Sequence, residues 1–392
     1  MLFLINKEYL YTSFFWVILC FFINIIYWVI ILKRDRVILI VAIVLLSLFG
    51  LIMIYSASNV WASYKFNDSY KYLKMQGLFL LVGYILLFVV SKIPYSLYKD
   101  KANIIFIICS ILLVLVLIPG IGTVRNGSRS WFGIGSFGIQ PSEFTKLGLI
   151  IFTSKYLANN NRIVKDIKSG VLPILSVILF IFFLIMLEPD FGTGVVIVMT
   201  IVVLLFISGV KMGFFVKIGI LGLIGIAALV IIAPYRMQRI VSFLNPWSDP
   251  LGSGFQIIQS LYAIGPGGLL GLGFGNSVQK HFYLPEPQTD FIFSIISEEF
   301  GFMGVLIVSL LFMTIIYIGF KIAMKVEDLF GKYLAFGITF GLAFQAMLNL
   351  MVVTNLIPVT GVTLPFLSYG GSSLLITMCS MGILLNISSN CS

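Results

Sequence analysis

Charged residues are scarce in this chain of 392 residues, in which Asp, Glu, Lys and Arg together make up 10%. Soluble globular domains carry about 25% charged residues. Hydrophobic residues reach 60%, and the mean hydropathy is +1.10. These values exclude an ordinary soluble domain and predict an all-α fold, a polytopic bundle of transmembrane helices for which the bilayer is the solvent.

Histidine and cysteine are scarce as well, with one and four copies. The single histidine, His281, excludes a multi-histidine metal site. Cys20, Cys109 and Cys379 lie inside apolar runs, and Cys391 lies beside the C-terminus. This placement argues against an extracellular disulfide and against a CxxC metal site, so packing is the simplest role for the cysteines.

Acidic residues are outnumbered by basic ones, 15 against 25, and the formal net charge is +10. The basic residues form small clusters between apolar runs, as juxtamembrane loops do, and no basic stripe with interleaved aromatic residues occurs. The charge therefore favours contact with membrane lipids and argues against nucleic acid as a partner.

Apolar runs recur along the chain, and about 20 apolar residues are enough to cross a bilayer core as a helix. We expect eleven such helices. The expected ranges are 12–32, 37–56, 75–90, 102–120, 142–157, 171–187, 191–210, 215–234, 291–320, 333–354 and 372–387.

The loops between these runs predict the orientation, because short cytoplasmic loops carry an excess of Lys and Arg. One set of alternate loops, which includes Lys99, Lys168 and Lys325, holds about 15 of the 25 basic residues. The C-terminus is therefore expected to be cytoplasmic, and the long segment 235–290 is expected outside.

The first run, 12–32, follows a single Lys7 and lacks a small-residue cleavage site before Lys33, which disfavours a cleaved signal peptide. We expect residues 1–35 to hold an extra hydrophobic segment, which is either an additional transmembrane helix or the product of a mis-assigned start codon. Residues 36–388 are expected to form one membrane domain, followed by a short cytoplasmic tail, 389–392.

Acidic residues concentrate on the predicted outer side. Intramembrane charge is costly unless it faces a cavity or water. The asymmetry therefore favours chemistry at the outer face over a proton relay through the whole membrane. The nine outer acids are Asp68, Glu143, Glu188, Asp190, Asp249, Glu286, Asp290, Glu298 and Glu299.

The segment 235–290 is the longest stretch without a span, and its glycines permit close backbone approach. Frequent apolar residues within it predict a re-entrant or interfacial helix. A lipid-linked head group could lie among Arg236, Arg239 and Lys280, although lipid phosphates alone would also explain these cations.

Asp290 stands where this segment enters a long apolar helix. Polar residues recur at i+4, i+7 and i+8 from it, which predicts a polar stripe that points into a cavity. These residues are Ser294, Ser297 and Glu298. The alternative is that Asp290 caps the helix and complements its dipole, and the sequence supports both equally. The dipole would lower the pKa of Asp290, whereas burial would raise it.

A second polar group surrounds the start of the expected helix 142–157. Arg129 and Trp131 precede the helix, and Pro141 suits its first turn. Glu143 and Lys146 are then three residues apart, close enough to pair. The pair either makes the helix insertable or places Lys146 on an anionic substrate group, with Glu143 holding it.

These segments resemble the SEDS family of shape, elongation, division and sporulation proteins. Matching motifs cover about nine-tenths of the chain, from near Arg36 to the end. The variants at 124–131 and 249–256 are most similar to the sporulation and cell-division branch. The motifs are Arg125 to Trp131, Gln140 to Glu143, Glu188 to Thr193, Asn245-Pro246, Asp249-Pro250, Gln259-Ser260, Tyr283 to Phe293 and Leu356 to Ser373.

The resemblance implies a ten-helix core, from which the run 12–32 departs. It also implies a peptidoglycan glycosyltransferase that polymerises lipid II into glycan strands outside the bacterial cytoplasmic membrane, for division or spore-cortex synthesis. A class B penicillin-binding protein would be its transpeptidase partner. Asp290 becomes the expected catalytic carboxylate. The expected substrate-binding residues are Trp131, Glu143, Lys146, Arg129, Lys280 and Glu286.

In such a reaction Asp290 would act as general base on the attacking sugar hydroxyl, and cations would stabilise the leaving pyrophosphate. Lys146, Arg129 and Lys280 are the candidate cations, and a divalent ion, Mg²⁺ or Mn²⁺, is a candidate cofactor. Two other functions stay open, a lipid II flippase and a non-catalytic scaffold for the transpeptidase.

Overall fold

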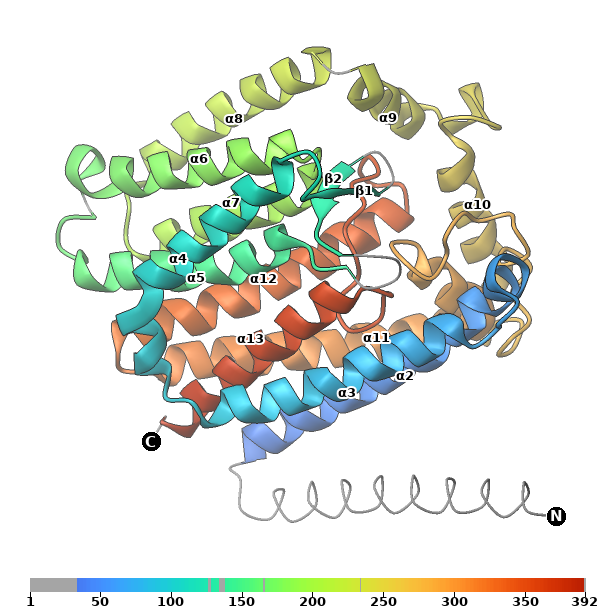
Figure 1. Ribbon diagram of the computed structural model, residues 1–392, viewed down its shortest axis with the longest axis horizontal. Helices are drawn as coiled ribbons and strands as arrows, with labels where there is room; N and C mark the ends of the chain where they lie inside the picture. The colour runs from blue at the N-terminus through green and yellow to red at the C-terminus, as the bar shows by residue number, and fades with distance from the viewer. Residues whose placement is uncertain (1–33, 126–127, 134–137, 165, 233, 391–392) are drawn as a thin grey trace.

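The computed structural model describes residues 34–390 except 126–127, 134–137, 165 and 233, and it describes the backbone alone at 125, 226, 229, 232 and 234–236. The expected helix 12–32 lies outside the described residues. Within them the chain is mostly helical, with one short two-stranded hairpin (Figure 1). The predicted all-α fold is confirmed.

Ten helices match the ten expected spans from 37–56 onward, with ends that differ by a few residues in most cases. The main exception is the first, which continues ten residues beyond its expected end at Ser56. The ten are α2 (Arg34–Phe66), α3 (Lys71–Lys92), α4 (Tyr95–Leu117), α5 (Pro141–Asn159), α6 (Leu172–Leu187), α7 (Phe191–Ile207), α8 (Met212–Ile232), α11 (Ile292–Lys325), α12 (Leu329–Val353) and α13 (Gly371–Ser389).

Smaller elements fill the connections. The strands β1 (Thr123–Arg125) and β2 (Ser128–Trp131) pair antiparallel between α4 and α5. A π-helical turn, Ile167–Val171, leads into α6, and 3-10 turns occupy Pro246–Ser248 and Gly265–Gly267. The helices α9 (Pro234–Leu244) and α10 (Phe255–Ile264) show that the long segment 235–290 contains helix, as predicted. A re-entrant or interfacial placement of this helix stays a prediction.

The helices have the length and apolar character of membrane spans. In the described part of the chain, seven segments of 18 or more residues are apolar enough to cross a bilayer, and the apolar stretches of α7 and α8 are shorter. Helix α5 is less apolar because Ser142, Glu143, Thr145 and Lys146 occupy its first two turns. The chain is a multi-pass membrane protein.

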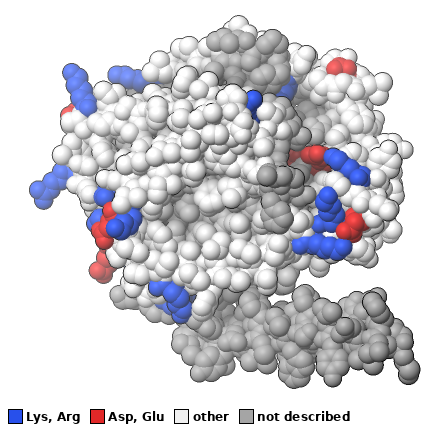
Figure 2. Space-filling view, viewed as in Figure 1, with Lys and Arg blue, Asp and Glu red and all other residues white. Residues whose placement is uncertain are grey.

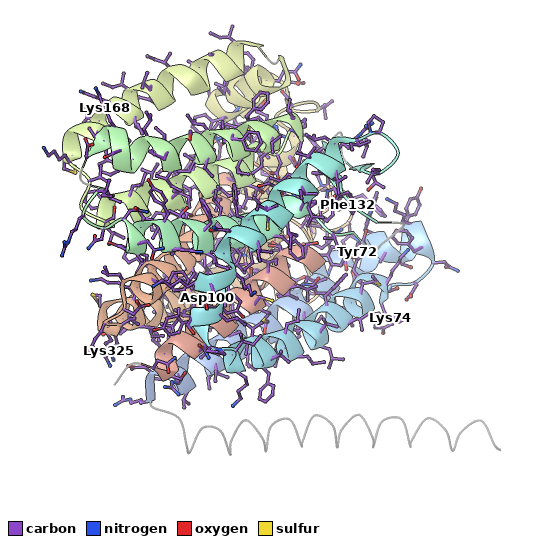
Figure 3. All side chains as sticks on the ribbon, turned by 60° about the vertical axis from the view of Figure 1, so that its left-hand side comes forward. Tyr72, Lys74, Asp100, Phe132, Lys168 and Lys325 are labelled. Carbon is purple, nitrogen blue, oxygen red and sulfur yellow. The ribbon has the colours of Figure 1, made fainter. Side chains whose placement is uncertain are left out.

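Charges gather at two ends of the bundle, with a broad uncharged band between them (Figure 2). Asp100, Lys168 and Lys325, from the loops predicted to be cytoplasmic, lie at one end, and Tyr72, Lys74 and Phe132 lie at the other (Figure 3). The two sets of alternate loops therefore separate as the sequence predicts. We call the end that holds Lys74 and Phe132 the outer end, after the orientation that the loop charges predict.

Helices α5, α11, α12 and α13 form the centre of the bundle, and α12 packs on α5, α7, α11 and α13. Helix α3 lies along α13, and α2 lies along α11 (Figure 1). Helix α8 lies at the edge and leaves Val216, Ile220 and Leu223 at least 56% exposed, as lipid-facing side chains are. Because α4, α7, α12 and α13 pack on α5, its polar outer end is enclosed by other helices.

The segment after α10 packs against a break in α11 and hydrogen-bonds to the backbone there. Gly301 has φ +58° and ψ −154°, so the helix is interrupted there and its neighbouring backbone groups need other partners. Leu272 N donates to Glu298 O (2.9 Å), and Phe302 N donates to Gly268 O (2.9 Å). A Cβ at position 301 would lie 2.5 Å from Gly271 N, so only glycine fits. The break fixes the segment that leads to Asp290.

Candidate active site

Asp290 lies in the turn before α11 and is partly exposed. Its Oδ1 accepts a hydrogen bond from Thr289 Oγ1 at 2.9 Å. The N-cap of α11 is Phe291, and no side chain caps that end. The helix-cap explanation for Asp290 is therefore wrong, and the carboxylate is left available at the outer end.

Burial raises the pKa of the Asp290 carboxyl above its usual range, and the negative charge of Glu286 adds to this effect. The hydrogen bond from Thr289 and the positive charge of Arg239 oppose it without cancelling it. Of the two opposing expectations for Asp290, burial prevails because the helix terminus does not hold the carboxylate. A raised pKa makes Asp290 a stronger base than a solvent-exposed aspartate.

Two amides of α12 connect the surroundings of Asp290 with those of Lys146. Asn349 Nδ2 donates to Asp290 O (2.7 Å) and to Val362 O (2.8 Å). Gln345, one turn earlier, accepts from Lys146 Nζ at 2.6 Å. Residues four apart face the same side of a helix, about 6 Å from one another. Asp290 and Lys146 are therefore attached to successive turns of one helix face.

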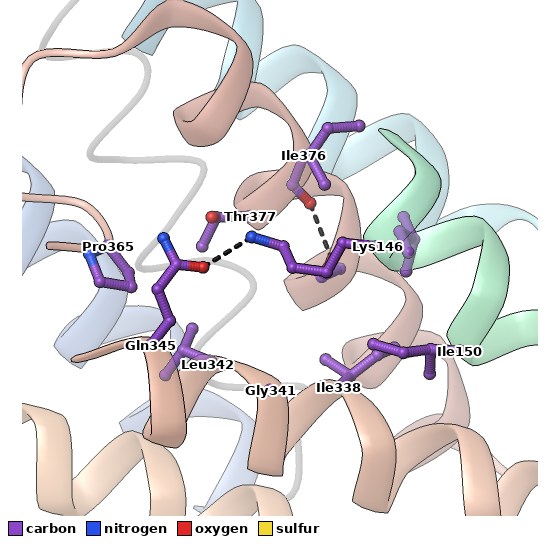
Figure 4. A pocket seen from close by; sticks show the side chains of 11 residues that line it. Lys146, Ile150, Ile338, Gly341, Leu342, Gln345, Pro365, Ile376 and Thr377 are labelled. Atoms are coloured by element: carbon purple, nitrogen blue, oxygen red, sulfur yellow. Dashed lines mark hydrogen bonds between the residues drawn. The ribbon is translucent and has the colours of Figure 1, made fainter. Parts of the chain in front are cut away.

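Glu143 and Lys146 form the predicted ion pair, with Nζ 2.7 Å from Oε2. Lys146 reaches from α5 toward Gln345 on α12, and its side chain lines a cavity of about 30 Å³ with Leu342 and Thr377 (Figure 4). A cavity of this size holds about one water molecule. The ammonium group thus lies beside internal space and is not packed on all sides.

The first turn of α5 is held by the turn between α6 and α7. Gln140 Nε2 and Ser142 Oγ donate to Asp190 Oδ2 at 2.8 and 3.0 Å. Asp190 also accepts from Thr193 N at 3.2 Å and so caps α7. The side-chain oxygens of Glu188 are buried and accept no hydrogen bond from the described residues, and burial raises the pKa of Glu188 to about 9. This turn supports the site and does not enter it.

Trp131 and Arg129 lie on strand β2, which packs against α4 and α5. Both side chains are half-buried. Thr123 Oγ1 donates to Trp131 O at 3.0 Å, and Ser128 Oγ donates to Glu188 O. The hairpin therefore joins Arg129 and Trp131 to the turn that supports α5, at the same end as Glu143 and Lys146.

Lys280 occupies a different place from the one expected of a substrate-binding cation. It is 3% exposed, and its Nζ lies 3.3 Å from Glu299 Oε1 and 3.4 Å from Ser56 Oγ. Ser56 Oγ donates to both oxygens of Glu299, at 2.6 and 2.8 Å. These contacts tie the segment before Asp290 to α2 and α11. Substrate binding by Lys280 stays a prediction that its burial disfavours.

The polar stripe predicted along α11 does not face a cavity. Ser294 Oγ lies 2.8 Å from Ser260 Oγ of α10, and Glu298 accepts from Ser277 Oγ at 2.6 Å. Ser297 Oγ donates back to Phe293 O at 2.8 Å. The stripe was predicted to line open space, and it instead binds the folded segment that packs over it.

The charges of Glu286 and Arg239 act on Asp290 in opposite directions. Glu286 is half-buried in a left-handed conformation, with φ +43°, four residues before Asp290. Arg239, on α9, is exposed and donates from Nη1 to Val359 O at 3.0 Å. The side chain of Arg236 lies outside the described atoms. Arg239 is thus a cation near Asp290 that the segment 235–290 was expected to supply.

Across the described residues, no three His, Cys, Asp or Glu side chains gather as metal ligands. Mg²⁺ needs only one or two protein carboxylates when phosphate oxygens complete its shell. Asp290 and Glu286, whose charges interact, are the carboxylates that would contribute to such a shell. A metal held by protein alone does not fit the described residues, so a divalent ion would need phosphate oxygens as further ligands.

Gln345 and Asn349 are site residues that the sequence motifs did not indicate. Both are buried amides inside an apolar helix, 2% and 0% exposed. Two amides four residues apart on one face of a predicted span are the signal that would have found them, because buried amides need partners.

Residues 36–392 match the family described as cell cycle protein, FtsW/RodA/SpoVE. Stage V sporulation protein E of Bacillus subtilis (strain 168) is 52% identical over 354 residues, which cover 90% of this chain and 96% of that protein. A protein of Geobacter sp. (strain M18) named probable peptidoglycan glycosyltransferase FtsW is 42% identical, with the same coverage of 90% and 96%.

Two solved structures resemble the fold. Rod shape determining protein RodA of Thermus thermophilus matches with a TM-score of 0.67 and 26% identity over 90% of this chain and 96% of that chain. A chain from a structure described as "Structural coordination of polymerization and crosslinking by a peptidoglycan synthase complex" matches with a TM-score of 0.73 and 29% identity, covering 90% and 97%. With the match over residues 36–392, this chain belongs to the FtsW/RodA/SpoVE family of cell cycle proteins.

Proposed function

We propose that this protein is a peptidoglycan glycosyltransferase that polymerises lipid II into glycan strands on the outer side of the bacterial cytoplasmic membrane. The observation that carries the proposal is Asp290, whose carboxylate does not cap α11 and has a raised pKa, at the outer end of a membrane bundle. The names of the relatives that cover nine-tenths of the chain or more support the same activity.

Asp290 accepts the proton of the attacking sugar hydroxyl as the new glycosidic bond forms and the bond to the lipid pyrophosphate breaks. A single displacement inverts the anomeric carbon. Asn349 fixes the main chain of Asp290 through its carbonyl oxygen, and Thr289 orients the carboxylate. Both contacts keep the base in place before the substrate arrives.

The leaving pyrophosphate needs positive charge more than it needs a proton donor. The candidate cations are Arg239, which is exposed, Arg129, which is half-buried, and Lys146, which is buried beside the small cavity. Glu143 holds Lys146 at 2.7 Å. A divalent ion bound by Asp290, Glu286 and the pyrophosphate would supply further charge neutralisation.

The partner in this proposal is a class B penicillin-binding protein, as the match to a chain of a peptidoglycan synthase complex suggests. The placement of charge disfavours a flippase. In the described part of the chain, every buried charged residue comes from a segment that the sequence predicts on the outer side. They are Glu143, Lys146, Glu188, Lys280, Glu298 and Glu299. A lipid carrier would need polar groups at every depth.

The test is Asp290→Asn in the purified full chain with its transpeptidase, measured as lipid II consumed over time. Loss of a general base lowers rates by about 10² to 10⁴ fold, while the thermal unfolding midpoint in detergent stays near that of the wild type. Retention of the wild-type rate would exclude Asp290 as the base. Transport of lipid II into protein-only liposomes by Asp290→Asn, without polymerisation by either protein, would favour the flippase.

The pH profile tests the base itself. Because the pKa of Asp290 is raised, the rate should fall on acidification at a higher pH than the ordinary aspartate value of about 3.9. Thr289→Val removes a hydrogen bond that lowers this pKa, so the acid limb should move to still higher pH. An acid limb that stays in place in Thr289→Val would contradict the assignment of that limb to Asp290.

A further inference from the structure

Helix α2 is longer than the membrane requires. Its 33 residues extend about 50 Å, whereas a bilayer hydrocarbon core is about 30 Å thick. The outer third, from Tyr55 to Phe66, therefore projects beyond the hydrocarbon into the head-group region and the water. This third is rich in aromatic, hydroxyl and amide side chains where the rest of the helix is aliphatic.

An open groove of about 470 Å³ runs along this projecting part of α2. Its walls are the loop to α3 and the segment before Asp290. The polar and aromatic residues that line it are Tyr55, Asn59, Ser63, Tyr64, Ser69 and Phe282. The groove is thus formed by three separate parts of the chain at the outer end of the bundle.

The aromatic rings of the groove are held in place yet remain accessible. Phe282 has φ +66°, which a bulky residue adopts only when its surroundings impose it. Its ring meets the edges of Trp61 and Tyr64, at centroid distances of 5.7 and 5.3 Å. Tyr64 is nevertheless 78% exposed and Phe282 50%. Fixed, exposed aromatic faces indicate a binding surface.

The side chains that line the groove are uncharged. The lysines beside it face other groups: Lys65 lies 5.4 Å from the Trp61 ring, Lys71 lies 3.2 Å from the Phe66 ring, and Lys74 pairs with Asp68 at 2.9 Å. Three aromatic rings and several neutral polar groups remain. A phosphate head group finds no dedicated cation here, whereas a neutral ligand with polar edges and apolar faces fits.

Asn59 supplies the polar contact that this ligand would satisfy. Its Oδ1 is buried and accepts no hydrogen bond within the described part of the chain. Asn59 itself lines the groove, so its side-chain amide is a polar group within reach of a ligand that lies there. Sugar rings carry such donors at their edges and C–H groups on their faces, which pack on aromatic rings.

The groove and Asp290 share one segment of the chain. Phe282 stands eight residues before Asp290 on the same segment. The ring of Tyr72, on α3, meets the edge of the Tyr369 ring at a centroid distance of 4.9 Å. Tyr369 N fixes this segment through Gln288 O at 2.8 Å. A polymer held at Asp290 by its reacting sugar could therefore extend along the projecting part of α2.

We propose that this groove binds sugar units of the growing glycan strand, one or more residues away from the reacting sugar, and retains the strand between additions. The proposal rests on the proposed function for the identity of the polymer. Saccharide binding by the groove is measurable without any turnover.

The binding test uses chitotetraose, a neutral β-1,4-linked tetrasaccharide, titrated calorimetrically into the purified full chain in detergent. Tyr64→Ala and Asn59→Leu should each weaken binding about threefold to tenfold. Tyr317→Ala is the matched control, because Tyr317 is 67% exposed near the opposite end of α11. Equal affinity in wild type and both groove variants, or no binding by the wild type, would overturn the proposal.

The product test measures glycan strand length per lipid II consumed, with the transpeptidase present. Tyr64→Ala should give strands shorter than those of the wild type and of Tyr317→Ala. Strands of unchanged length would overturn retention by the groove. If the wild type binds the tetrasaccharide and consumes no lipid II, the proposed function fails while the groove stands as a saccharide site.

Discussion

Two pairs of a glutamate and a lysine lie at the outer end of this protein, and their surroundings differ. Glu143 and Lys146 are 2.7 Å apart, with side chains 7% and 11% exposed beside a small cavity. Glu299 and Lys280 are 3.3 Å apart, with side chains 0% and 2% exposed. Residue type alone would give the two lysines the same role.

The difference shows how enclosure decides what a charged pair does. Lys280 donates to Glu299, Ser56 and Gly275 O, so its hydrogen bonds serve the fold. Lys146 donates to Glu143 and Gln345 and keeps one side toward the cavity. We therefore expect the Glu299–Lys280 pair to support stability and the Glu143–Lys146 pair to support activity.

The largest expected effect is on the enclosed pair. Glu299→Gln leaves Lys280 buried without its counter-ion, which costs about 3–5 kcal/mol of unfolding free energy. Asp35→Asn is the matched control, because it breaks a pair with Lys321 whose side chains are 28% and 34% exposed, and such pairs contribute about 0–1 kcal/mol. Thermal unfolding in detergent measures both. Equal unfolding midpoints for the two variants would remove the distinction between the pairs.

Lys146→Met should affect rate more than stability. Loss of a cation that stabilises developing charge lowers turnover by about 10² to 10³ fold. The Glu143–Lys146 pair is more exposed than the Glu299–Lys280 pair, so the loss of stability should be smaller than in Glu299→Gln. Lys146→Arg, which keeps the charge, is the control. A variant Lys146→Met that unfolds as readily as Glu299→Gln and polymerises at the normal rate per folded molecule would reverse the comparison.

Glu188 sharpens the comparison, because it is a buried carboxylate without a lysine. Its folded pKa of about 9 exceeds the unfolded value of about 4.3. Its contribution to stability is therefore complete below about pH 4.3 and is lost as pH rises toward 9. The free energy of unfolding measured from pH 5 to 9 should decline. Glu188→Gln should reduce that decline by about 1–3 kcal/mol at the alkaline end. A variant with the same pH slope as the wild type would assign the decline to other groups.

Much of the architecture was predictable, because each span carries its signal locally. The ten expected ranges from 37–56 onward each contain a helix, since the bilayer requires about 20 apolar residues in sequence. The end of α2 was misplaced by ten residues for the same reason. Hydropathy detects the part of a helix that lies in hydrocarbon, and the projecting turns that line the groove are polar.

The site was predictable only where its contacts are local. The Glu143–Lys146 pair follows from a spacing of three residues on a helix, and the structure confirms it. The partner of Lys280 lies 19 residues away, and the hydroxyl that joins their pair, Ser56, lies 243 residues from Glu299. Gln345 and Asn349 were missed because their importance lies in what they contact on other helices.

The sequence by itself determined a multi-pass helical membrane protein with its acidic residues at one end and Asp290 at a helix entrance. Hydrophobic length and helical spacing are properties of neighbouring residues, so these features needed no fold. The tertiary structure decided that Asp290 does not cap α11, that Lys280 is enclosed while Lys146 faces a cavity, and that α2 joins Phe282 in a groove. Each of these depends on burial and on partners brought together by folding, which no local pattern specifies.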